Sequence, residues 1–262
     1  MADGKMSLTA HLEDLRKRII ISAVTVLAAF VVAFNYSEQI FSVLIFPLRN
    51  SLDFSVTGMY VRFVPVDKLQ STKLVFLAPT EAFWMNMKVA FVAALVFSLP
   101  VIFHQLWQFI SPGLQQTEKK YVIPFVLTAT GLFLVGASFC FIIVLPFALS
   151  FLLNYKVGDF LMPMLSVGQY VDFCLKFILA FGAIFELPII LIFLTKIGLV
   201  TPQTLKRNRR LAIVLAFVAG AVLTPTPDVF NQTLMAVPII LLYEVGIQLS
   251  VFFVKRKPDG DG

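Results

Sequence analysis

The stretch FCLKFILAFGAIFELPIILIFL, Phe173 to Leu194, decides the fold class of this chain. It holds about twenty apolar residues, enough for a helix to cross a bilayer core of about 30 Å. One carboxylate, Glu186, lies near its middle, and Pro188 follows two residues later, where a proline removes a backbone donor and bends a helix. A carboxylate inside a membrane is costly unless it faces protein, a cavity or a partner. Glu186 is therefore a candidate functional residue.

The composition of the whole chain indicates a polytopic membrane protein. Of its 262 residues, 59% are hydrophobic and 14% are charged. That leaves too little polar sequence to cover such a core in water. The net charge of +6 comes from basic residues at the ends of apolar runs, which membrane orientation explains better than nucleic-acid binding. Cys140 and Cys174 lie in or beside apolar runs, and there are only two histidines, so we expect no metal site, disulfide or cofactor.

Six apolar segments predict a single all-α membrane domain, residues 1–262, with six transmembrane helices. The expected spans are about 19–36, 88–110, 121–150, 173–197, 210–224 and 233–254. The third span is longer than a bilayer requires and carries Pro124 and Pro146, which predicts a tilt or a kink. The fifth has an apolar run of only about thirteen residues, too short for a standard bilayer. Between the first two spans, a weak signal at Met59 to Val64 favours a short strand.

The distribution of lysine and arginine predicts the orientation. If both termini lie on one side together with loops 111–120 and 196–210, that side holds 14 of the 21 Lys and Arg residues. The other seven are spread over longer loops. Because cytoplasmic loops carry the excess of basic residues, both termini are expected in the cytoplasm.

Two acidic positions on that side stand among bases. Glu13 and Asp14 precede Arg16, and Glu118 precedes Lys119. Carboxylates there can accept paired hydrogen bonds from the guanidinium groups of a cationic peptide. They can equally balance their own basic neighbours, and the residues alone leave both readings open.

The acidic residues inside the spans also allow several roles. Glu186 can carry a proton or ion, can contact another membrane helix, or can be a carboxyl kept neutral within the bundle. Glu244 is similar but lies nearer the end of its span. His104 is expected to be a polar packing residue near the interface.

Several motifs carry a resemblance to a known family. They are HLEDLRKRI (His11–Ile19), FPL (Phe46–Leu48), SLPVIFHQLWQFISPGL (Ser98–Leu114), AFGAIFELPI (Ala180–Ile189) and LTPTPDVFNQTLMAVP (Leu223–Pro238). In this order and at these spacings they resemble the TatC family, the multispanning component of the twin-arginine protein translocase. The resemblance covers nearly the whole chain.

The resemblance implies a fold and a function. The fold is a concave, glove-like bundle of six helices in the bacterial cytoplasmic (inner) membrane. The function is that of a receptor that binds twin-arginine signal peptides of folded precursors at the cytoplasmic face. Such a receptor assembles with TatA- and TatB-like single-span partners, self-associates in the receptor complex, and uses the proton-motive force and not ATP. No enzymatic activity, cofactor or nucleic-acid partner is implied.

The resemblance also assigns roles to individual residues. For signal-peptide binding the matching positions are Glu118, Asp14, Arg16 and Phe109. The family usually has a glutamate where this chain has Asp14, so the charge is kept but the reach is shorter. Glu186 matches an intramembrane residue that faces partner helices, and Pro47 and Asp228 match the family's proline after the first span and acidic residue after the fifth.

Two other classes of function fit the sequence less well. A proton- or ion-coupled secondary transporter would use Glu186 and Glu244 as ligands, but it predicts an inverted repeat, which the two halves of the chain do not show. An intramembrane hydrolase would need a zinc motif or a nucleophile elbow, and neither motif is in the sequence.

Overall fold

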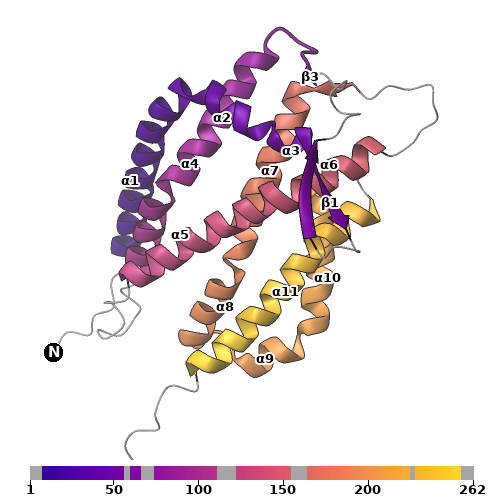
Figure 1. Ribbon diagram of the computed structural model, residues 1–262. Coiled ribbons are helices and arrows are strands. Elements are labelled where there is room, and N and C mark those ends of the chain that lie inside the picture. The colour runs from indigo at the N-terminus through magenta and orange to yellow at the C-terminus, as the bar shows by residue number, and fades with distance from the viewer. Residues whose placement is uncertain are drawn as a thin grey trace, which may run out of the picture. The chain divides into compact units, whose positions relative to one another are not determined.

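The computed structural model describes residues 8–55, 60–65, 74–110, 122–154, 164–224 and 228–254, most of which lie in helices (Figure 1). Five helical segments in this part of the chain are long and apolar enough to cross a membrane: His11–Asn35, Glu81–Ile110, Val122–Leu153, Val167–Lys196 and Val229–Phe252. The predicted fifth span, 210–224, corresponds to α10 (Arg209–Leu223), which has 15 residues. At about 22 Å it is shorter than a bilayer core of about 30 Å.

The chain divides into two compact units. The first contains Met1–Phe41 and Phe83–Gly131, and the second contains Ser42–Ala82 and Leu132–Gly262. The boundary falls inside three helices, α2 (Ser37–Leu44), α4 (Glu81–Ile110) and α5 (Val122–Phe139).

In the first unit, α1 (Leu8–Asn35) packs along α4 through small side chains (Figure 1). Ala33 of α1 is buried with Ala90 and Ala94 of α4. Because alanines add little bulk, they let two membrane helices approach closely, which is how such helices gain contact area without a hydrophobic driving force. At the other end of α4, Trp107 contacts Phe125 of α5 with ring centroids 4.6 Å apart.

The long third span changes its helical pitch before a proline. α5 continues into a π-helical turn, η4 (Cys140–Val144), and then into α6 (Leu145–Asn154), whose second residue is Pro146. A proline cannot donate to the preceding turn, and a wide π turn takes up that defect. Pro124 lies in the first turn of α5, where a proline is tolerated. Of the two prolines expected to disturb this span, Pro146 is the one beside a distortion.

In the second unit, α11 (Val229–Val254) packs against both α8 (Leu187–Lys196) and α10. The core beneath them contains Leu191, Leu205 and Ile247. The short helix α9 (Pro202–Arg207) starts at Thr201, whose side chain caps it, so the predicted helix start at Thr201-Pro202 is confirmed.

The structure adds short strands to a chain expected to be all-α. β1 (Asn50–Ser55) pairs antiparallel with β2 (Tyr60–Pro65), so the weak strand signal at 59–64 is confirmed one residue further on. This hairpin lies beside α6 (Figure 1). A second pair, β3 (Leu74–Val75) with β4 (Leu165–Ser166), is parallel.

One carboxylate joins the second pair of strands to the helices that follow them. Glu81, the first residue of α4, accepts hydrogen bonds from the Ser166 hydroxyl and from the backbone N–H of Gly168, the latter 2.8 Å away. It also accepts from the backbone N–H of Leu77 at 2.6 Å. Glu81 therefore holds the start of α4 to the first turn of α7 (Val167–Phe185).

Candidate functional site

A cluster of polar side chains joins α1 to α4 at the end of the first unit where α1 begins and α4 ends. Arg18 donates from Nε to Asp14 Oδ2 at 2.8 Å and from a terminal nitrogen to Gln108 Oε1 at 2.6 Å. The side chains of Arg18 and Asp14 are only 17% and 24% exposed. Partly desolvated, charge-assisted bonds of this kind are stronger than surface ion pairs, so the guanidinium holds Asp14 and Gln108 in fixed positions.

Aromatic and imidazole groups extend this cluster. The ring of His11 on α1 stacks on Phe109 of α4, with centroids 4.4 Å apart and an interplanar angle of 18°. One helical turn before Gln108, the ring of His104 lies 3.1 Å from the Gln108 amide nitrogen. Four residue types that bind cationic peptides therefore meet in one place: a carboxylate, an amide, an imidazole and a flat aromatic face.

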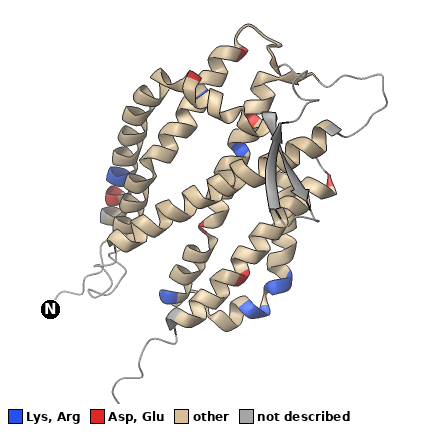
Figure 2. Ribbon diagram, in the orientation of Figure 1, with Lys and Arg blue, Asp and Glu red and all other residues tan. Residues whose placement is uncertain are grey.

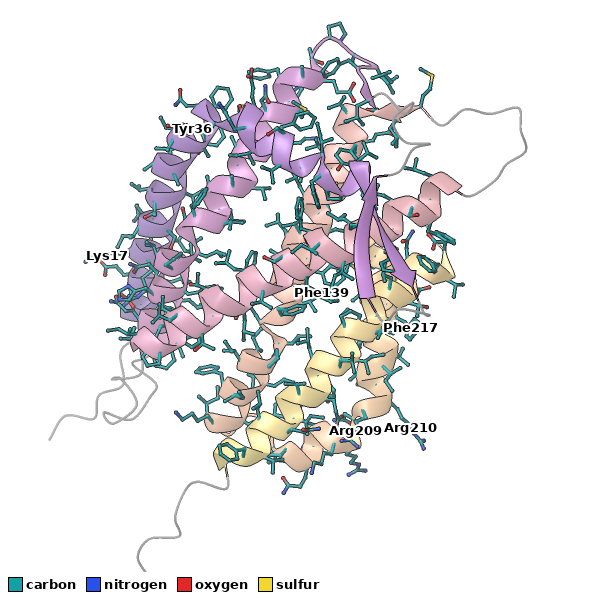
Figure 3. The ribbon with its side chains drawn as sticks, in the orientation of Figure 1. Lys17, Tyr36, Phe139, Arg209, Arg210 and Phe217 are labelled. Atoms are coloured by element: carbon teal, nitrogen blue, oxygen red, sulfur yellow. The ribbon has the colours of Figure 1, made fainter. Side chains whose placement is uncertain are left out.

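The four residues predicted to bind the signal peptide do not all belong to this cluster. Asp14 and Phe109 are both in the cluster. Arg16 is exposed on α1, and it is Arg18, one turn after Asp14, that pairs with the carboxylate. The neighbouring Lys17 points outward from α1 (Figure 3). Glu118 lies outside the described residues.

Three members of the cluster were not predicted from sequence: Arg18, Gln108 and His11. A signal for Gln108 was available, since His104 and Gln108 stand four residues apart in a largely apolar helix and so share one face. For Arg18 the same spacing rule applies, because Asp14 and Arg18 are four residues apart whereas Asp14 and Arg16 are not on one face.

Glu186 lies where the fourth span breaks. α7 ends at Phe185 and α8 begins at Leu187, with Pro188 as the second residue of α8. The chain passes the break with a tightened turn, in which the Glu186 N–H donates to the carbonyl of Ala183 at 3.1 Å. The predicted bend at Pro188 therefore takes the form of a one-residue interruption at the carboxylate itself.

Glu186 is buried, at 8% exposure, and its Oε1 has no hydrogen-bond partner among the described residues. A buried carboxylate oxygen without a partner is costly, and more so in a membrane. This atom is therefore available to a polar group that is absent from the isolated chain.

Close helix packing holds the segment before Glu186. A Cβ on Gly182 of α7 would lie 2.5 Å from the ring of Phe133, and a Cβ on Gly136 of α5 would lie 2.6 Å from the Phe181 carbonyl oxygen. Each helix thus offers a glycine to a phenylalanine of the other. Such reciprocal contacts fix the crossing of α5 and α7, and with it the position of the turn that carries Glu186.

Two other predicted residues have structural contacts. Asp228 caps α11: its Oδ1 accepts from the Asn231 backbone N–H at 2.7 Å, and its Oδ2 accepts from the Asn231 side-chain amide at 2.9 Å. Carboxylates are favourable at helix N-termini. Pro47 is buried in the short helix α3 (Phe46–Arg49), where a proline near a helix start needs no donor.

Glu244, the other acidic residue considered as an ion ligand, is paired within the chain. Arg209, at the start of α10, donates to Glu244 Oε1 on α11. Figure 3 shows Arg209 and Arg210 together at that end of α10, and Figure 2 shows basic residues gathered over α9 and the start of α10. Over the residues that the structure describes, no group of three or more His, Cys, Asp or Glu side chains is arranged to hold a metal ion.

Comparison with known proteins identifies the family. The model of the Sec-independent protein translocase protein (TatC) family matches residues 10–238. The TatC protein of Carboxydothermus hydrogenoformans is 35% identical over 261 residues, which cover 100% of this chain and 99% of the relative. That of Campylobacter jejuni is 41% identical over 240 residues, covering 92% and 91%.

A solved structure agrees with these relatives. The crystal structure of a twin arginine translocase receptor, TatC, superposes with a TM-score of 0.78 at 38% identity, covering 93% of this chain and 99% of the solved chain. The predicted family and the predicted six-helix membrane class are thereby confirmed. This chain belongs to the TatC family of Sec-independent protein translocase proteins.

Proposed function

We propose that this chain is the receptor subunit of a twin-arginine translocase and that it recognises the arginine pair of signal peptides where α1 begins and α4 ends. It acts in the bacterial inner membrane with both termini in the cytoplasm, where it binds folded precursors and assembles with TatA- and TatB-like single-span proteins and with further copies of itself. Transport then draws on the proton-motive force. Recognition and assembly, and not bond-making chemistry, are its contribution.

The observation that carries this proposal is the polar cluster formed by Asp14, Arg18, Gln108, His11 and Phe109. An ionised carboxylate has two oxygens and about four acceptor positions. Arg18 occupies Oδ2 of Asp14 from one side. An arginine of the ligand can therefore bind the remaining acceptor positions of the same carboxylate, while Arg18 holds that carboxylate in place.

Charge balance assigns the second arginine of the ligand to Glu118. Within the cluster, Asp14 is already matched by Arg18, so two incoming guanidinium groups require a further carboxylate. Glu118 lies eight residues after the end of α4 in the sequence. Phe109, stacked on His11, presents an aromatic group near which a planar guanidinium is favoured over an ammonium. This preference supports discrimination of arginine from lysine.

Glu186 is proposed to contact a partner helix. Its buried, unpartnered Oε1 at a helix break supports this role, because a polar group on a docked single-span helix would satisfy it. Intramembrane hydrogen bonds contribute on average only about 0.6 kcal/mol, so the contact sets the register of the partner more than its affinity.

The transporter alternative receives less support. It requires Glu186 and Glu244 to act together as ion ligands, whereas Glu244 is already paired with Arg209. An intramembrane charge that is neutralised within its own bundle has little affinity left for a transported cation.

The experiment that tests the proposal is binding of a twin-arginine signal peptide to the purified protein in lipid nanodiscs. Glu118→Gln and a twin-lysine peptide are each expected to weaken binding about tenfold or more, since each removes a bidentate charge-assisted contact. Glu13→Gln serves as the control, because Glu13 is exposed on α1 next to Asp14 and its substitution removes one negative charge, as Glu118→Gln does. The proposed site would be wrong if the wild type bound both peptides equally and Glu118→Gln bound the twin-arginine peptide as tightly as Glu13→Gln does.

A further inference from the structure

The hydrogen bonds between α1 and α4 have a direction that their chemistry fixes. A guanidinium group can only donate, so the Arg18 terminal nitrogen, 2.6 Å from Gln108 Oε1, makes that oxygen the acceptor. The nitrogen of the same amide, Gln108 Nε2, lies 3.1 Å from His104 Nε2. An amide nitrogen can also only donate. The contact is therefore a hydrogen bond only if His104 Nε2 accepts it.

This direction decides which ring nitrogen of His104 carries the proton. A neutral imidazole has one N–H and one acceptor nitrogen, and a doubly protonated ring has no acceptor. With Nε2 as the acceptor, the proton lies on Nδ1. The opposite orientation of the Gln108 amide is unfavourable, because it would place the NH₂ group against the Arg18 guanidinium, donor against donor, at the same short distance.

We propose that His104 is a positioning residue of the arginine-pair site, a role that rests on the proposed function. Its Nε2 holds the Gln108 amide in one orientation, and the Gln108 carbonyl then holds Arg18. Arg18 in turn orients the Asp14 carboxylate toward the ligand. All four side chains belong to the first unit, and none of them is fully exposed, so each bond is stronger than it would be in water.

The residue types at positions 104 and 108 suit this role. An amide accepts at one end and donates at the other, so Gln108 can link a cation on one side to a neutral ring on the other. A glutamate there would also pair with Arg18, but both of its oxygens accept, and His104 Nε2 would have to donate. Because His104 and Gln108 are four residues apart on α4, they face each other without any distortion of the helix.

The direction of the hydrogen bond is tested by magic-angle-spinning NMR of ¹⁵N-histidine-labelled protein in lipid, purified with a tag that contains no histidine. The chain has only two histidines, so the spectrum of His104→Gln shows which ring signals belong to His104. At about pH 8, where a free imidazole is neutral, the His104 proton is expected on Nδ1. In Gln108→Glu we expect a proton on Nε2, because a carboxylate oxygen replaces the donor.

The positioning role is tested by titration of a twin-arginine signal peptide in nanodiscs. His104→Leu removes the acceptor, so Gln108 can rotate away from Arg18, and binding is expected to weaken about threefold to tenfold. His104→Gln keeps an acceptor oxygen at a similar reach and should bind within about twofold of wild type. Gln105→Leu places the same apolar side chain at the next position of α4, outside the contact, and is expected to bind as wild type does.

These measurements separate the role of His104 from the proposed function. A proton on His104 Nε2 in the wild type would overturn the inference. Wild-type binding by His104→Leu, or an equal loss of binding in His104→Leu and His104→Gln, would overturn it as well. If the wild type bound twin-arginine and twin-lysine peptides equally while the His104 proton lay on Nδ1, the proposed function would be wrong and the direction of the hydrogen bonds would be confirmed.

Discussion

At the scale of single residues, two arginines on α1 have different surroundings. Arg18 bonds to Asp14 and Gln108, whereas Arg16 is exposed. We expect Arg18→Gln to lower the free energy of unfolding by about 1 kcal/mol, because it removes two charge-assisted hydrogen bonds that are mostly shielded from water. It should also weaken signal-peptide binding, because Asp14 loses the group that orients it. Thermal melting in detergent and peptide titration measure the two effects.

Arg16→Gln is the matched control for that change. It removes the same charge two residues earlier but leaves the contact between α1 and α4 intact. Its melting temperature should stay within about a degree of wild type. If Arg16→Gln lowered stability as much as Arg18→Gln, net charge and not the Asp14–Arg18–Gln108 contact would be the cause.

Glu186 provides a second prediction at this scale, through the difference between losing a charge and losing a hydrogen-bonding group. Glu186→Gln keeps an amide that can bond to a partner helix, whereas Glu186→Ala removes the group and leaves a small cavity. We expect the glutamine variant to retain most of the crosslinking to single-span partners and of the export of a folded reporter. The alanine variant should crosslink at shifted positions along the partner helix and lose export, while signal-peptide binding stays at the wild-type level in each.

Two outcomes would count against this role for Glu186. If the alanine variant crosslinked and exported normally, the carboxylate would have no partner to contact. If the glutamine variant failed as completely as the alanine variant, an ionisable group would be required, which favours proton transfer over assembly.

At the scale of helices, the crossing of α5 and α7 depends on two glycines. A Cβ at Gly182 would meet the Phe133 ring at 2.5 Å, and one at Gly136 would meet the Phe181 backbone at 2.6 Å. Gly182→Ala or Gly136→Ala should therefore destabilise the fold by about 1–3 kcal/mol through overpacking. Gly131→Ala, in the same helix α5 but with no atom within 4 Å of its Cβ, should be neutral or slightly stabilising.

Melting curves of the three alanine variants in one detergent check this prediction. The order expected is Gly131→Ala at or above wild type, and the other two clearly below it. Equal melting temperatures for all three would mean that the crossing of α5 and α7 is looser than these distances imply.

Glu81 gives a further prediction for the elements of the second unit. Its carboxylate accepts from Ser166 and from the Gly168 and Leu77 backbones. In Glu81→Gln the side chain has one acceptor oxygen in place of two, so at least one of these bonds is lost. Hydrogen exchange at the first turn of α7 should become faster, while exchange in α11 stays unchanged. Glu38→Gln, an exposed residue in the first turn of α2 (Ser37–Leu44), is the control and should leave the α7 signal as it is.

The elements that the sequence predicted well are those with strong local signals. The apolar runs predict the long helices because lipid requires every backbone group to be bonded within its own segment. Thr201-Pro202 predicts the start of α9 because capping is a local interaction. The π turn before Pro146 could not be predicted, because it depends on how the helix relieves a missing donor. The parallel pairing of β3 with β4 could not be predicted either, because it depends on a contact between residues far apart in the chain.

The candidate site was predictable only in part for the same reason. Asp14 and Phe109 were recognised from motifs, and Glu186 from the cost of a charge in an apolar span. The four-residue spacing of Asp14 and Arg18 predicts their ion pair, but the contact of Arg18 with Gln108 depends on which side of α1 faces α4. That orientation follows from the alanines at Ala33, Ala90 and Ala94 and is not visible in the HLEDLRKR motif alone.

At the scale of the whole molecule, the orientation in the membrane is open to direct test. Cys140 and Cys174 are buried, so a single cysteine added elsewhere can be labelled selectively. We expect Gln203→Cys on α9 and a cysteine appended to either terminus to react with an impermeant maleimide only after the cytoplasmic side is made accessible. Tyr36→Cys, at the far end of α1 in Figure 3, should react from outside intact cells. Labelling of Gln203→Cys from outside would reverse the orientation proposed from the basic loops.

Binding of the arginine pair of a signal peptide where α1 begins and α4 ends can be tested by photocrosslinking from a single reactive residue placed next to the arginine pair, followed by mapping of the attached peptides. Crosslinks are expected within residues 8–18 and 104–120, and they should be markedly fewer in Glu118→Gln. Crosslinks that map chiefly to α8, α10 or α11, and that persist in Glu118→Gln, would contradict this binding site.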